Sequence, residues 1–143
     1  MLHDVVEDPA SRSPAALRAA YEARVREAVD AVGVEAAATA SGVDEATVAA
    51  LAAGESPELT VEDAAALLAA GEDGVDADVI LAELRDHLLL GMTTGVLDVD
   101  TVASNVELDL SGQEVQQVLE GRVAMTLAEL AAIQQFIAAR NER

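Results

Sequence analysis

The stretch Leu110–Ile137 constrains the fold most, because it carries two helix-start signals in close succession. Ser111 followed by Glu114, and Thr126 followed by Glu129, both match the capping box. In a capping box, a hydroxyl and a carboxyl side chain accept hydrogen bonds from backbone amides that would otherwise be unpaired at a helix N-terminus. The stretch therefore predicts two helices joined by a loop.

The first of these two predicted helices has two chemically different sides. On a helical wheel its apolar side carries Val115, Val118 and Leu119. The opposite side carries Gln113, Gln116, Gln117 and Glu120, and Arg122 follows the helix. We name Gln113, Gln116, Gln117 and Arg122 the amide face. Amphipathic patterning of this kind predicts that the helix packs by its apolar side and turns the amide face outward.

Helix punctuation of the same kind recurs through the rest of the chain. Ser13-Pro14 is a cap followed by a proline in the first turn, and Thr60 with Asp63 is a further capping box. Alanine carries much of the apolar fraction and only two residues are aromatic, which favours close-packed helices. The sequence therefore predicts an all-α fold. The expected helices cover residues 14–32, 35–40, 45–53, 61–70, 77–94, 101–105, 112–120 and 127–137.

The two halves of the chain present these signals in the same order. Aligning Gly54 with Gly121 matches the caps, the apolar positions and the long helix that precedes each short pair. We interpret this as a pseudo-repeat of two helix-turn-helix-like units, each of four to five helices. The expected division is a loose N-terminal lead-in, residues 1–12, a first unit, residues 13–72, and a second unit, residues 73–143.

The two units differ on the outward side of their corresponding short helices. The counterparts of Gln113, Gln116, Gln117 and Glu120 are Ala46, Ala49, Ala50 and Ala53, which we name the alanine face. Methyl groups cannot read polar base edges, but they allow another helix to approach closely. Residues 34–83 also hold twelve acidic residues and no basic one, whereas residues 110–143 hold four acidic and three basic residues. Only the second unit is therefore expected to meet a polyanion.

Composition restricts the environment and chemistry of the protein. The formal net charge is −19, and all eight basic residues are arginines. This composition resembles that of proteins from salt-loving microbes. Such a charge is tolerated in molar salt, because the salt screens charge repulsion to within about 3 Å. The chain has no cysteine, no apolar run of membrane-spanning length and no recognisable signal peptide. We expect a halophilic, acidic, cytoplasmic protein without contact to a membrane.

The segment Val34–Gly54 resembles the helix-turn-helix of the Cro and phage-repressor type. The resemblance rests on Ala38, Gly42 and Val43 at the turn, and on Val48 and Leu51 in the helix that follows. In such motifs a small residue lets the two helices approach, and glycine adopts the positive φ of the turn.

The second unit resembles the same family at its recognition helix. That resemblance places base-reading positions at Gly112, Gln113 and Gln117, and a phosphate contact at Arg122. Glutamine can bond adenine through two hydrogen bonds, whereas Gly112 has no side chain for reading a base. The resemblance implies a DNA-binding regulator of transcription that reads double-stranded DNA as a homodimer. The whole chain also resembles a haloarchaeal family of unknown function, which implies no activity.

Two other classes of function are weighed against DNA binding. In the alternative, the chain is a helical protein–protein interaction or assembly module that contacts its partner through the alanine face. An enzyme is not expected, because His3 and His87 are the only histidines and no phosphate-binding glycine loop is present. Asp98 and Asp100 could bind a metal, but helix capping explains them better. We therefore expect no catalytic residue, no metal and no cofactor.

Overall fold

The computed structural model describes residues 2–142, and it is entirely helical over that range apart from connecting segments. A short 3₁₀ helix, η1 (Pro9–Ser11), precedes the α-helices. The α-helices are α1 (Pro14–Val32), α2 (Val34–Ser41), α3 (Glu45–Ala52), α4 (Val61–Gly71), α5 (Ala77–Thr94), α6 (Val99–Asn105), α7 (Gly112–Leu119) and α8 (Leu127–Asn141). The all-α prediction is confirmed, and most helix ends lie within two residues of their expected positions.

The helices begin where the local sequence supplies a cap. The three expected capping boxes all form, at the starts of α4, α7 and α8. At α6 the cap is Asp98 and not Asp100: the amide of Thr101 donates to Asp98 Oδ1 at 2.8 Å. Asp44 occupies the cap position of α3, but its side chain makes no capping hydrogen bond. Local hydrogen bonding therefore explains most of the helix boundaries.

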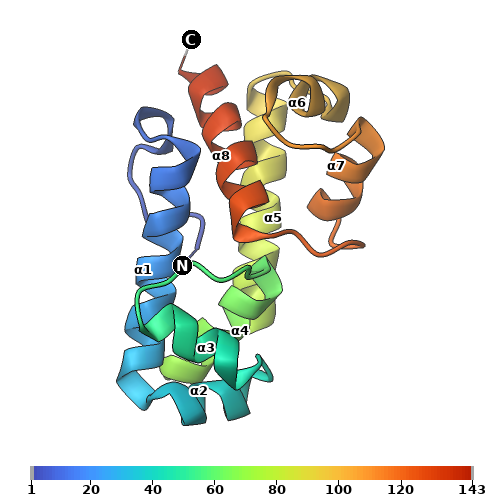
Figure 1. Cartoon of the computed structure of the whole chain (residues 1–143). Helices are drawn as coiled ribbons and strands as arrows, with labels where there is room; N and C mark the ends of the chain where they lie inside the picture. Colours follow the sequence, from blue (N-terminus) through green and yellow to red (C-terminus); the bar gives the residue numbers. More distant parts are fainter. Residues whose placement is uncertain (1, 143) are drawn as a thin grey trace.

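Three long helices, α1, α5 and α8, run along the molecule, with α1 at one edge and α6 and α7 at the other in Figure 1. Helix α8 contacts both α1 and α5, and α4 contacts α1, α2 and α5. Fully buried side chains from all of these helices form one apolar cluster, including Leu17, Val25, Leu67, Leu84, Leu130 and Ile133. Residues 13–72 and 73–143 thus share one core, and their description as two repeated units stays a prediction.

A short antiparallel bridge joins the segments that lead into α4 and α8. The amide of Val61 donates to the carbonyl of Met125 at 2.7 Å, and the amide of Leu127 donates to the carbonyl of Leu59 at 2.8 Å. The bridged residues are Thr60 and Thr126, the caps that the sequence alignment of the two halves pairs. The bridge fixes the starts of α4 and α8 side by side.

The N-terminal lead-in differs from the loose segment expected from the sequence. Leu2 is fully buried, and η1 contacts α8. A buried amide on α8 also contacts it: the Tyr21 hydroxyl donates to Gln134 Oε1, and Gln134 Nε2 donates to the carbonyl of His3 at 2.8 Å. Because a buried amide without partners is costly, the lead-in backbone is held where it accepts this hydrogen bond.

Candidate functional site

The amide face lies on α7, beside α5 and on the opposite side of α5 from α1 in Figure 1. Val115, Val118 and Leu119 hold α7 on the protein and are at most 4% exposed. On the outward side Gln113 and Gln116 are exposed, Gln117 is half-buried, and Arg122 is exposed in the loop that follows. The fold thus brings the four residues of the amide face to one solvent-facing side.

Glu120 engages two members of the amide face. Gln116 Nε2 donates to Glu120 Oε1 at 2.9 Å, and Arg122 forms an ion pair with the other carboxylate oxygen. The hydrogen bond from Gln116, and then the contact with Arg122, hold the pKa of Glu120 below its ordinary value. The charge of Arg122 is therefore balanced by Glu120, and a phosphate would have to compete for it.

The start of α7 is packed tightly against α6. Gly112 is buried, and a Cβ atom at this position would lie 1.9 Å from Asp100 Oδ1. The nearest backbone atom, Asp100 Cα, would lie 3.3 Å from that Cβ, so α6 leaves little room for a side chain here. Gly112, which the repressor resemblance assigns to base reading, is thus covered by α6. The same contact places the carboxylate of Asp100 beside the N-terminus of α7.

The surroundings of the amide face are acidic. Between residues 98 and 122 the only basic residue is Arg122, and from α5 the guanidinium of Arg85 lies against Gly121. Six exposed acidic residues share the same segment: Asp98, Asp100, Glu107, Asp109, Glu114 and Glu120. Hydrogen bonds from Thr101 hold the pKa of Asp98 below its ordinary value, so this carboxylate stays charged. Phosphates approaching α6 and α7 would meet more negative than positive charge.

The alanine face lies on the surface of α3. Ala46, Ala49 and Ala53 are exposed and Ala50 is half-buried. The other side of α3 is anchored, because Val48 and Leu51 are fully buried. Arg26 Nε also donates to the carbonyl of Leu51 at 2.6 Å. The helix is therefore firmly held and presents the alanine face outward.

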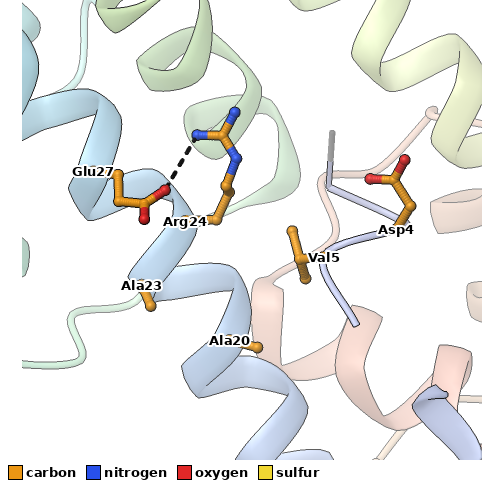
Figure 2. Close-up of a pocket in the computed structure, with 6 residues that line it drawn as sticks. All are labelled: Asp4, Val5, Ala20, Ala23, Arg24 and Glu27. Atoms are coloured by element: carbon orange, nitrogen blue, oxygen red, sulfur yellow. Dashed lines mark ion pairs between the residues drawn. The ribbon is translucent and has the colours of Figure 1, made fainter. Parts of the chain in front are cut away.

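A cavity of about 400 Å³ lies between the lead-in and α1. Asp4 and Val5 line it from the lead-in, and Ala20, Ala23, Arg24 and Glu27 line it from α1 (Figure 2). Arg24 pairs with Glu27 at 3.9 Å and also with Glu72, and the hydrogen bond with Glu72 is the main cause of its raised pKa. Because two carboxylates already balance this guanidinium, the cavity is not suited to an anion.

The two histidines lie together, away from the amide and alanine faces. The rings of His3 and His87 are 4.9 Å apart between centroids. Burial, and then the neighbouring His3, lower the pKa of His87. Within residues 2–142, no group of three or more histidine, cysteine, aspartate or glutamate side chains is arranged to hold a metal ion.

The sequence interpretation missed an apolar surface on the second half of α5. Leu89, Leu90 and Val96 are 45%, 68% and 90% exposed. The signal that could have indicated it is the segment Leu88–Leu97, which contains no charged residue. Leu88 is buried in the core, whereas helical periodicity gives no reason for the two exposed leucines that follow it.

Comparison with known proteins gives a family without an assigned activity. A profile described as "Family of unknown function (DUF5791)" matches residues 17–140. No curated protein and no solved structure matches the chain. Among the helices described in residues 2–142, none has the length and apolar character needed to cross a membrane.

Proposed function

We propose, from the premise that this chain belongs to DUF5791, a family of unknown function, that it is a protein-interaction module which binds a partner helix through the alanine face of α3. The observation that carries the proposal is the exposure of the alanine face on an anchored helix. A helix face that only meets water in so acidic a protein is expected to carry charged side chains. Four alanines in that place instead suit contact with another helix.

The chemistry of the partner follows from the alanine face and its rim. Small side chains allow two helix axes to approach to the short end of the usual 8–10 Å range. Asp44 and Glu45 are exposed at the start of α3, and Glu55 is exposed just after it. A matching partner is a helix with small or aliphatic side chains facing α3 and arginine or lysine at its edges.

Site-specific photo-crosslinking in the producing cells tests this proposal. A photoreactive residue at Ala49 should give one discrete adduct, whereas the same residue at Ala19, an exposed alanine on α1, should not. With the captured partner purified, Ala49→Glu should weaken binding at least tenfold and Ala19→Glu should leave it unchanged. Equal adducts at both positions, or binding that is insensitive to Ala49→Glu, would reject the alanine face as the binding site.

DNA recognition by the amide face is the second candidate, and the exposure of Gln113 and Gln116 favours it. Counterion release contributes little to such binding, because the two basic groups at α7, Arg122 and Arg85, are each paired with a carboxylate. Hydrogen bonds to base edges would have to carry it, in salt concentrated enough to screen the carboxylates around α7. We infer from the charge of −19 and the absence of lysine that the protein works in such salt.

A gel-shift assay in molar KCl separates the two candidates. If the amide face reads DNA, genomic fragments should be retarded, and Gln113→Ala with Gln117→Ala should weaken retardation at least tenfold. Ala49→Glu is the matched control, since it leaves the amide face intact. Retardation that persists in the double glutamine variant would reject the amide face as the DNA-binding site. If no fragment is retarded, DNA recognition is rejected and the alanine-face proposal is retained.

A further inference from the structure

We propose that the second half of α5 is the contact surface between two copies of this chain, which pair antiparallel across Leu89 and Leu90. This surface consists of Leu89, Leu90, Thr93 and Val96, and we name it the α5 seam. It is separate from both the alanine face and the amide face, so the proposal stands independently of the proposed function.

The first observation is the exposure of large apolar side chains on one element. Leu90 is 68% exposed and Leu89 is 45% exposed, although both lie on a helix whose inner side, including Leu84 and Leu88, is buried. Val96, just beyond the helix, is 90% exposed. Single exposed apolar residues are ordinary, but a group of them on one helix end indicates an interaction site.

The second observation is strain at Val96. Its φ is 53°, and no other non-glycine residue among residues 2–142 has a positive φ. The amide of Leu97 donates to the carbonyl of Met92 at 2.8 Å, which closes the helix in a Schellman motif with Val96 in the left-handed position. A β-branched residue is an outlier there. Such strain is kept where the side chain serves a purpose, and here it presents an isopropyl group to solvent.

The distribution of charge along α5 suits a second copy as the partner. The outward acidic residues, Glu83 and Asp86, lie in the first half of the helix, and the segment Leu88–Leu97 is uncharged. In an antiparallel pair centred between Leu89 and Leu90, Asp86 of each copy faces Thr93 of the other. Carboxylates of the two copies are thereby kept apart at opposite ends of the contact.

The overall charge of −19 opposes association of two copies and limits where they can meet. Two identical acidic molecules repel each other over most of their surface, so they can associate only where charged residues are absent. The contact is also small compared with stable interfaces, which places it among weak, reversible associations. We therefore expect a concentration-dependent dimer that becomes tighter as KCl is raised and repulsion is screened.

Disulfide trapping tests the pairing directly, because the chain has no cysteine. Leu90→Cys places one thiol beside the two-fold axis, and mild oxidation should give a covalent dimer quickly. Val32→Cys, at a side chain 42% exposed at the end of α1, is the matched control and should crosslink at least tenfold more slowly. Equal crosslinking rates for the two variants would overturn the proposal.

Sedimentation equilibrium in 2 M KCl provides the second measurement. The wild type should dimerise, Leu90→Glu should weaken dimerisation at least tenfold, and Val32→Glu should not change it. Circular dichroism should show that both variants keep the fold, since both side chains are exposed. A wild type that stays monomeric at all concentrations would overturn the proposal, as would a dimer that Ala49→Glu disrupts and Leu90→Glu does not.

Substitution of Val96 distinguishes a role in dimerisation from a purely structural role, because the two roles predict different changes in monomer stability and dimer affinity. Val96→Asn removes the apolar side chain and relieves the left-handed strain, because asparagine tolerates this conformation. The variant should therefore be more stable as a monomer and yet several-fold weaker as a dimer. A change of both quantities in the same direction would contradict a role for Val96 in the α5 seam.

Discussion

Val96 holds a left-handed backbone position that glycine holds at the ends of two other helices. Glycine would relieve the left-handed position at the end of α5, but the glycine of this segment stands one residue earlier. A Cβ atom on Gly95 would lie 2.6 Å from Asn141 Oδ1, which is the end of an exposed side chain that can move aside. By contrast, the equivalent positions after α3 and α7 are glycines, Gly54 and Gly121, each with a positive φ.

Replacing Val96 should stabilise the monomer. Left-handed backbone costs an L-residue roughly 1–2 kcal/mol, and Val96 is too exposed to regain that energy by burial. We expect Val96→Asn to raise the free energy of unfolding by about 1 kcal/mol in urea denaturation at low protein concentration. Gly54→Val is the reverse control and should lower it by a similar amount. A less stable Val96→Asn variant would show that the left-handed position carries no strain.

The histidine pair predicts a pH dependence with a definite sign. Burial and His3 lower the pKa of His87 in the folded protein, while Asp4 opposes this effect. The unfolded chain therefore binds a proton at His87 more readily than the folded chain. Stability from this group is present above the ordinary histidine pKa of about 6.5 and is lost as pH falls through the lower folded value.

Thermal unfolding of a matched pair measures this dependence. Between pH 7.5 and pH 5, the melting temperature of the wild type should fall more than that of His87→Gln, which cannot take up the proton. Both proteins share the titration of every other group, so the difference between them reports His87. Parallel pH profiles would mean that the histidine contact is not maintained in solution.

Local sequence signals predicted where helices begin, but they did not predict features that depend on contacts between distant residues. The starts of α4, α7 and α8 follow from capping boxes that span four residues, so the sequence was sufficient for them. The docked lead-in depends on the contact of His3 with Gln134, 131 residues apart. Gln134 lies on a helix face where the sequence offers no signal that an amide is buried.

For the amide and alanine faces too, the sequence predicted the local features and not the contacts between distant residues. The outward orientation of the amide and alanine faces follows from helical periodicity, and the structure places them so. The packing of Gly112 on Asp100 and the pairing of Arg122 with Glu120 are contacts with residues that periodicity does not connect. These contacts place carboxylates beside the start and the end of α7, which the sequence alone did not indicate.

The crossing of α1 and α4 offers a prediction about packing. A Cβ atom on Gly71 would lie 2.1 Å from the carbonyl oxygen of Ala28, and backbone atoms cannot move aside. We expect Gly71→Ala to lower the free energy of unfolding by about 2–3 kcal/mol in urea denaturation. Gly91→Ala is the matched control, because its Cβ would meet only the side chains of Ile137 and Asn141. Similar losses in both variants would contradict a backbone-limited crossing.

The alanine face allows a test of its position before any partner is known. Because Ala49 is exposed, Ala49→Glu should change the free energy of unfolding by less than about 0.5 kcal/mol. Val48 is fully buried on the adjacent side of α3, and Val48→Ala should cost roughly 2 kcal/mol through the cavity it leaves. If Ala49→Glu unfolds the chain, the alanine face is packed inside the molecule and cannot bind a partner.

At the scale of the whole molecule, the shared core and the surface charge act against each other. One apolar cluster holds both halves together, and it consists largely of small and medium-sized side chains. The acidic surface opposes compaction at low ionic strength, because repulsion extends over a Debye length of about 10 Å at 0.1 M salt. This repulsion opposes both the binding of an acidic partner and the pairing of two copies in dilute buffer.

We therefore expect the melting temperature to rise steeply between 0.05 and 0.5 M KCl, the range in which screening changes most. A variant in which the exposed residues Glu55, Glu58, Glu107 and Asp109 become amides carries −15 in place of −19, and it should start higher and rise less. General effects of salt on apolar burial act on both proteins alike, so the difference between their slopes isolates charge repulsion. Equal slopes would assign the effect to apolar burial, and a melting temperature independent of KCl would remove the physical basis for placing this protein in concentrated salt.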